Sequence, residues 1–361
     1  MRVLIVDTCY PPFLESHYRV NPALADASYE QQWRALMDTQ FGTADAYSHY
    51  LRALGHEAEE VVVNCGPLQA AWAREHGLGR RARNLWRGPS SEQIFTAQAR
   101  AFQPDVVYVQ NLSVLPPHVL RSLGARLVVG QIASEPPAAA QLSAFDLILT
   151  SFPHFVPRFR ESGIASEYLR IGFDPRVLDR LGPCERDLGV VFVGSLGRRQ
   201  HGTGNEVVDA LARAHAIDVW GTGIDDWPAD SALRAAYRGE AWGIEMFRLF
   251  ARAKVVVNRH IDVAGDFANN MRLYEATGVG SLLVTDAKRN LGELFVPGQE
   301  VVVYRDADEL VDSVAWYLDH PDERTAIAHA GQQRTLAEHG YDRRMAELVT
   351  ILEAHLGDRA R

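Results

Sequence analysis

The stretch NNMRLYEATGVGSLLVTD, residues 269–286, combines a helix pattern with a short apolar strand. Two glycines, Gly278 and Gly280, separate them, and glycine is typical of the point where a helix ends. A helix that leads into an apolar strand is the repeating unit of an α/β fold. Arg272 and Glu275 interrupt the otherwise apolar helix, about 60° apart on one face. Two opposite charges on a buried face need an explanation.

The N-terminal half of the chain shows the same alternation. Its consecutive apolar residues are typical of parallel strands that are covered on both faces. These strands are predicted at 2–7, 58–64, 104–111, 125–132 and 145–152. Helices are predicted at 44–54, 91–102, 116–123 and 153–162. Residues 8–40 interrupt the pattern, with a helical piece at 29–38. We expect an insertion there, at the edge where such sheets bind ligands.

The C-terminal half forms a second series of the same kind, after a segment rich in proline and glycine at 172–183. Strands are predicted at 187–195, 216–221, 253–258, 280–286 and 300–306. Helices are predicted at 204–214, 243–252, 268–277, 307–319, 322–337 and 341–356. We therefore expect two α/β domains in tandem, with an N-terminal domain at 1–172, a linker at 173–186, a C-terminal domain at 187–340, and a last helix within 341–361 that packs toward the N-terminal domain.

Composition and charge narrow the class of protein. The 361 residues carry a net charge of −9, which disfavours nucleic-acid binding. Three widely spaced cysteines argue against a disulfide framework or a zinc site and fit a reducing cytoplasm. The opening MRVLIVD predicts a strand rather than a signal peptide. No apolar run is long enough to span a membrane, so any membrane contact would be peripheral. The basic stretch at 79–88 is more simply explained as a solvated loop.

Two glycine-containing turns follow strands in the C-terminal half. Gly194 and Ser195 end one strand and precede Arg198, and small residues there let backbone N–H groups approach an anion. Neither the phosphate-binding loop nor the dinucleotide fingerprint is present. Gly221 and Gly223 follow the next strand, where they leave room for a flat ring. The simpler alternatives are a plain turn with solvated arginines and, for the adjacent Asp225 and Asp226, a turn or helix cap.

A third cluster follows the strand that ends at Asn258. After a polar loop with His260, Asp262 and Asp266, Asn269 and Asn270 open a helix, where free N–H groups and the helix dipole favour an anion. We expect a phosphate at this helix start and ribose hydroxyls at Glu275. The alternative is that Arg272 and Glu275 form a purely structural pair, although a buried ion pair is a weak source of stability. All three clusters lie at carboxyl ends of strands, where α/β sheets bind ligands.

The tandem halves, the segments GFDP and VFVGS, and NNMRLYEATGVGSLLVTD with ELVDSVAWYLDHPDER after it resemble GT-B glycosyltransferases. The nearest branch is the bacterial spore-coat-maturation-like family, with its N-x-R-x-Y/F-E-A-x-x-x-G signature. The resemblance covers 187–350 well and the first half in outline. It implies two Rossmann-like domains with a cleft between them, and a nucleotide-sugar donor held by the C-terminal half without a metal or other cofactor.

The resemblance also implies roles for particular residues. Glu275 matches the glutamate that contacts the donor ribose, Gly194 and Ser195 match the loop near the diphosphate, and Arg272 and Asn270 match positions near the phosphates. Many retaining relatives carry a second glutamate where this chain has Phe267, so stereochemistry stays open. An inverting reaction needs a general base in the first half. The candidates for that base are Asp45, His17 and Asp7, and the sequence favours Asp45, at a predicted helix start.

We therefore expect a cytoplasmic glycosyltransferase of polysaccharide or glycoconjugate biosynthesis. It would transfer a hexosyl or related group to a saccharide, lipid-linked or natural-product acceptor. The alternatives are a GT-B sugar-nucleotide epimerase, which needs no acceptor, and a non-catalytic bilobal sugar-binding protein. A dehydrogenase fits less well, because no dinucleotide fingerprint follows the first strand.

Overall fold

The chain forms two compact units. The computed structural model describes residues 1–78 and 88–358, with the backbone alone described at 198–203 and at 358. Unit 1 comprises Met1–Leu169 and the chain from Met345 onward, and unit 2 comprises Arg170–Arg344. The last helix, α17 (Tyr341–Asp358), therefore begins in unit 2 and continues in unit 1. The basic stretch at 79–88 lies, except for Gly88, outside the described residues.

Unit 1 is built on a parallel sheet in the order β2-β1-β3-β4-β5-β6. The central strand β1 pairs with β2 from Arg2↔Glu57 to Asp7↔Val62 and with β3 on its other side. Five strands confirm the prediction from apolar runs. β6 was not predicted, because its residues, SEY, contain no apolar run. The strands are β1 (Arg2–Asp7), β2 (Glu57–Val62), β3 (Val106–Val109), β4 (Leu127–Ile132), β5 (Leu147–Thr150) and β6 (Ser166–Tyr168).

Helices connect the strands of unit 1, and the predicted insertion is itself helical. It contains α1 (Pro11–Val20), the 3-10 helix η1 (Pro22–Asp26) and α2 (Tyr29–Met37), which Ser28 and Gln31 open with a capping box. α4 was not predicted, because its Gly-Pro start resembles a turn, although proline is also favoured in a first helical turn. The remaining helices are α3 (Ala46–Ala53), α4 (Gly66–Glu75), α5 (Ser91–Phe102), α6 (Pro117–Arg121), α7 (Ala139–Leu142) and α8 (Phe155–Glu161).

Unit 2 has a second parallel sheet, in the order β12-β11-β10-β7-β8-β9. All five predicted strands of this half are present. β9, with the residues YRG, was not predicted, for the same reason as β6. The strands are β7 (Leu188–Val193), β8 (Ile217–Trp220), β9 (Tyr237–Gly239), β10 (Ala253–Asn258), β11 (Leu282–Asp286) and β12 (Val302–Tyr304).

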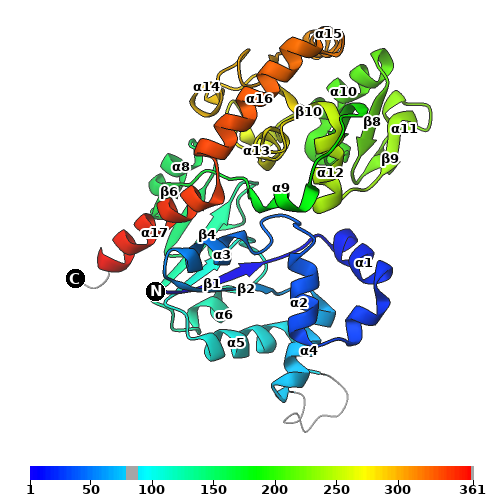
Figure 1. Cartoon of the computed structure of the whole chain (residues 1–361). Helices are drawn as coiled ribbons and strands as arrows, with labels where there is room; N and C mark the ends of the chain where they lie inside the picture. Colours follow the sequence, from blue (N-terminus) through cyan, green and yellow to red (C-terminus); the bar gives the residue numbers. More distant parts are fainter. Residues whose placement is uncertain (79–87, 359–361) are drawn as a thin grey trace. The chain divides into compact units, whose positions relative to one another are not determined.

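Helices cover both faces of the unit 2 sheet. Val191 and Val193 of β7 pack with α9, α12, α13 and α14, and the alternate residues Val190 and Phe192 pack with α10 and α15. α13 and α16 lie side by side (Figure 1). The helices are α9 (Arg176–Leu181), α10 (Arg198–Ala214), α11 (Ala232–Ala236), α12 (Ile244–Arg252), α13 (Met271–Gly278), α14 (Leu291–Leu294), α15 (Ala307–Asp319) and α16 (Pro321–Glu338).

Each sheet has one point where the strand order reverses. In unit 2, the order β9-β8-β7-β10-β11-β12 is that of dinucleotide-binding folds, with the reversal between β7 and β10. In unit 1, the reversal lies between β1 and β3. Loops diverge at the carboxyl ends of such strand pairs and leave a crevice, so the ligand site is expected there.

Candidate functional site

The loop after β7 lies at the reversal point of unit 2. Gly194 and Ser195 leave β7, and Gly197 is the N-cap of α10. The loop after β8 runs beside it, since Gly194 N–H donates to Trp220 O at 3.0 Å and Leu196 N–H donates to Thr222 O at 2.7 Å. Arg198 was also predicted to contact the ligand. Its side chain lies outside the described residues.

Gly221 and Gly223 are glycines because these two loops touch. Gly221 has a φ of +147°, and a Cβ there would lie 1.7 Å from Gly194 O. Gly223 has a φ of +86°, and a Cβ there would lie 2.7 Å from Gly197 N. Side chains would push the loop after β7 out of place. From the sequence, we expected glycine at these two positions in order to leave room for the flat ring of a ligand. The structure gives a different reason, the contact between the two loops.

Arg259 holds the same loop from the other side of the reversal point. It follows β10, is 9% exposed, and donates to Ser195 O at 2.7 Å and to Asn205 Oδ1 at 2.8 Å. Burial lowers the pKa of Arg259, but a guanidinium stays protonated in proteins. A fixed positive charge therefore lies beside the loop that opens α10. The sequence analysis missed Arg259; its place directly after a strand end was the available signal.

Asn258 and Asn270 form one amide cluster at the start of α13. Asn270 Nδ2 donates to Asn258 Oδ1 at 2.9 Å, and Asn258 Nδ2 donates to Thr285 Oγ1 at 2.9 Å. Asn270 also caps α13 by accepting from Leu273 N–H at 3.3 Å. Asn269 is fully buried, and its Oδ1 accepts from the Tyr274 hydroxyl at 2.8 Å. The structure therefore brings Asn258 and Asn270 together and turns the Asn269 amide into the core.

Arg272 and Glu275 share a face of α13, as predicted, and form an ion pair with each other. Arg272 also lies over the Phe250 ring at 5.0 Å and donates to Met246 Sδ at 2.7 Å. Glu275 is buried, and burial raises its pKa despite the lowering effect of the Arg272 charge and hydrogen bond. The Arg272 charge therefore offsets part of the cost of burying this carboxylate one turn inside the helix.

His260 and Asp286 pair at the carboxyl ends of β10 and β11. His260 Nδ1 lies 2.7 Å from Asp286 Oδ1, which also accepts from the His260 backbone N–H at 3.1 Å. Lys288 Nζ lies 3.3 Å from Asp286 Oδ2. Burial alone would raise the pKa of Asp286, but the His260 hydrogen bond and the charges of His260 and Lys288 hold it below its usual value. Asp286 is a second residue that the sequence analysis did not select.

Asp225 and Asp226 belong to the 3-10 turn η3 (Ile224–Asp226), and Asp225 pairs with Arg234 at 3.3 Å. The turn alternative is thus confirmed for these two residues. Within residues 1–78 and 88–358, no group of three or more His, Cys, Asp or Glu side chains is placed to hold a metal ion.

Asp7 lies at the reversal point of unit 1. It ends β1, and its Oδ1 accepts from Thr8 N–H at 2.6 Å. Thr8 Oγ1 accepts in turn from Asn111 Nδ2 at 3.2 Å, which links the loops after β1 and β3. Burial raises the pKa of Asp7 to about 6, although the Thr8 hydrogen bond opposes this. Asp7 is thus a carboxyl group poised to titrate near neutral pH.

The other two base candidates lie on different elements of unit 1. Asp45 is the N-cap residue of α3, without a side-chain capping bond to that helix. His17 lies on α1, half-buried beside Phe13, and burial lowers its pKa. Its Nε2 has no hydrogen-bond partner within the described residues. Phe13 stacks on Phe41 at 4.1 Å, which joins α1 to the segment before α3.

Comparison with known proteins agrees with this architecture. Residues 198–350 match a family model described as glycosyl transferase-like. No curated protein sequence matches the chain significantly. Among solved structures, Anabaena HepE in complex with UDP-glucose is 13% identical, with a TM-score of 0.62 over 98% of this chain and 100% of its own. The chain has the GT-B fold.

Two further GT-B structures support the assignment of the fold. AviGT4, a glycosyltransferase involved in avilamycin A biosynthesis, is 17% identical, with a TM-score of 0.61 over 99% of this chain and 98% of its own. Sucrose-phosphate synthase from Thermosynechococcus elongatus is 13% identical, with a TM-score of 0.57 over 99% of this chain and 100% of its own. Within the described chain, no helix of this GT-B fold is both long and apolar enough to cross a membrane.

Proposed function

We propose that this chain is a glycosyltransferase that moves a hexosyl or related group from a nucleoside-diphosphate sugar to a saccharide, lipid-linked or natural-product acceptor, without a catalytic metal. The observation that carries the proposal is the loop of Gly194 and Ser195. It lies at the strand-order reversal of unit 2, against Arg259, in a GT-B fold whose residues 198–350 match a glycosyl transferase-like family. The HepE and AviGT4 descriptions add support, since the first names UDP-glucose and the second a glycosyltransferase.

The donor pyrophosphate would lie at the start of α10. The positive end of the helix favours a negative charge there, and Arg259 and Arg198 add positive charge. These groups would stabilise the diphosphate as it leaves, so the reaction would need no metal ion. Gly221 and Gly223 would contribute by holding the two loops together.

The donor ribose would lie against Glu275. A carboxylate accepts two hydrogen bonds from the adjacent hydroxyls of a ribose, and the charge of Arg272 favours the ionised form of Glu275 against the effect of its burial. Asn258, Asn269 and Asn270 would hold the start of α13 in place, so that it faces the phosphates of the donor. This set of contacts fits the signature of the spore-coat-maturation-like branch, to which we assign the chain as part of the proposal.

Unit 1 would bind the acceptor and, in an inverting reaction, supply the general base. Asp45 and His17 are the candidates from the sequence, together with Asp7. Asp7 has the strongest support, because it lies at the reversal point of its own sheet and burial raises its pKa toward the pH at which a general base works best.

A thermal-shift panel of nucleoside diphosphates tests the donor site. We expect at least one of them to raise the melting temperature of the full chain, because a ligand that binds only the folded state stabilises it. Glu275→Gln should weaken that binding while keeping the side-chain volume, and Glu293→Gln, an exposed glutamate of unit 2, should not. Unchanged affinity in Glu275→Gln would refute the role given to Glu275.

Labelled donor then distinguishes the enzyme classes. With an acceptor mixture, transfer is indicated when mass spectrometry detects both the released nucleoside diphosphate and an acceptor that carries the labelled sugar. Conversion of the sugar without an acceptor would indicate an epimerase instead, and binding without any product would indicate a binding protein.

A further inference from the structure

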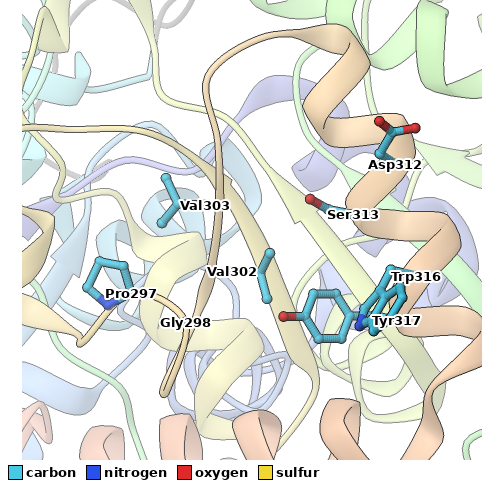
Figure 2. Close-up of a pocket in the computed structure, with 8 residues that line it drawn as sticks. All are labelled: Pro297, Gly298, Val302, Val303, Asp312, Ser313, Trp316 and Tyr317. Carbon is cyan, nitrogen blue, oxygen red and sulfur yellow. The ribbon is translucent and has the colours of Figure 1, made fainter.

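A pocket separate from the donor site lies between β12 and α15 in unit 2. Its volume is about 610 Å³, within the range of roughly 300–1,000 Å³ typical of ligand pockets. Figure 2 shows Val302 and Val303 on the strand, with Asp312, Ser313, Trp316 and Tyr317 on the helix. The pocket shares no residue with the loops after β7 and β10.

Trp316 provides a fixed and exposed aromatic surface in this pocket. The residue is 50% exposed, which is unusual for so large an apolar side chain. The indole does not move freely, because His320 stacks on it at 3.6 Å with an interplanar angle of 11° and its Nε1 donates to Glu323 Oε2 at 3.1 Å. A surface that is already ordered loses little entropy when a ligand binds to it.

Unused polar groups surround this aromatic surface. Asp312 is exposed and precedes Trp316 by one helical turn, as Ser313 precedes Tyr317, so the four side chains project from neighbouring turns. In the described part of the chain, neither the Asp312 carboxylate nor the hydroxyls of Ser313 and Tyr317 have a hydrogen-bond partner. β12 is the last strand of its sheet, so its outer edge also has no neighbouring strand there.

The residues that line the pocket favour one class of ligand over the others. A phosphate is disfavoured, because a carboxylate lines the pocket and no arginine or lysine does. A metal ion is also disfavoured, because Asp312 is the single carboxylate among the residues that line the pocket. A purely apolar ligand would leave Asp312 and Ser313 without partners. A pyranose fits both kinds of lining, because its C–H face is attracted to the negative face of an aromatic ring while its hydroxyls donate to a carboxylate.

We propose that the pocket between β12 and α15 binds a short oligosaccharide, with one sugar ring packed on Trp316 and its hydroxyls at Asp312 and Ser313. This saccharide site is distinct from the proposed donor site. It extends the proposed function by favouring a saccharide among the acceptor classes, as a place where a glycan chain is held.

Saturation-transfer NMR on the full chain tests the site with cellotriose, maltotriose, mannotriose and N,N′,N″-triacetylchitotriose. We expect ring protons of at least one trisaccharide to receive saturation. Trp316→Ala should raise the dissociation constant of the trisaccharide at least tenfold, and Asp312→Asn should also raise it. Trp242→Phe, at a partly exposed tryptophan of unit 2 outside the pocket, should leave it unchanged.

Two results would overturn the saccharide site: no trisaccharide of the panel receives saturation, or binding persists unchanged in both Trp316→Ala and Asp312→Asn. The thermal shift with nucleoside diphosphates is measured on the same variants and should stay at the wild-type value. Saccharide binding without any nucleotide binding would refute the proposed function and leave this site standing, so the two proposals fail separately.

Discussion

Glu60 is a buried acid whose environment opposes its charge. It is 3% exposed, accepts from Ser48 N–H at 2.8 Å, and lies near Asp45 and Arg52. Burial raises its pKa to about 8, although the Ser48 hydrogen bonds lower it. The folded chain therefore keeps a proton that the unfolded chain releases near pH 4.5. The free energy of unfolding should fall as pH rises from 4.5 through about 8.

Glu60→Gln should remove this loss of stability. We expect the variant to be more stable than the wild type above pH 8, by a few kcal/mol, and to lose that advantage near pH 5. Urea denaturation at pH 5 and pH 9 measures the difference. Glu57→Gln, an exposed position on the same strand, serves as the control. A pH profile of stability that is the same in Glu60→Gln and the wild type would contradict the prediction.

The proposed role of Asp7 as the general base predicts how turnover depends on pH. If it is the general base, only its deprotonated form is active, so the rate should rise with pH through about 6. Asp7→Asn should lower turnover by roughly 100-fold or more and remove this rise. Asp26→Asn, an exposed acid of the helical insertion, should keep normal activity. If Asp45→Asn or His17→Gln causes the larger loss, that residue is the base and Asp7 is not.

At the scale of elements, the contact between the loops after β7 and β8 depends on glycine. A methyl group at Gly221 would meet Gly194 O, and the φ of +147° is strained for any other residue. We expect Gly221→Ala to lower the free energy of unfolding by at least about 2 kcal/mol, because overpacking and backbone strain cost roughly 1–3 kcal/mol each.

Gly189→Ala is the matched control for this loop contact. Gly189 lies in β7 itself, with open space around it and no positive φ. Its replacement should leave stability within a few tenths of a kcal/mol, as is usual away from special sites. Chemical denaturation measures the free energy of unfolding of both variants. Equal values would show that the two loops rearrange at no cost in stability.

At the scale of the whole molecule, activity should survive removal of metals. The positive groups expected to stabilise the leaving diphosphate belong to the chain itself, namely Arg259, Arg198 and the N-terminus of α10. Turnover after treatment with EDTA should match that of the untreated enzyme. Loss of turnover that Mg²⁺ or Mn²⁺ restores would show that a metal takes part, and would refute this element of the proposed function.

The apolar runs of the sequence were enough to predict the two-unit α/β architecture. Runs of consecutive valines, isoleucines and leucines that alternate with helix patterns are typical of a parallel sheet covered on both faces, and ten strands were predicted from them. β6 and β9 could not be predicted this way. Their residues, SEY and YRG, form strands only because a neighbouring strand edge pairs with them.

The candidate site was only partly predictable. The sequence showed that Arg272 and Glu275 share a helix face, because helical periodicity alone determines this. It could not separate the roles of Asn269 and Asn270, which are adjacent in the chain but point to different partners. Nor could it select Arg259, whose importance comes from Ser195 and Asn205, more than fifty residues away in the chain.

Sequence alone therefore determined what depends on local spacing and burial: the strands, the main helices, the tandem organisation and the charged pair on α13. Tertiary structure decided what depends on distant residues meeting. It put Gly194 against Gly221, Arg259 beside Ser195, Asp7 at a strand-order reversal and Trp316 beside the edge of β12. The physical reason is that periodicity is encoded within a few residues, whereas contacts between loops are fixed only when the sheet that carries them has formed.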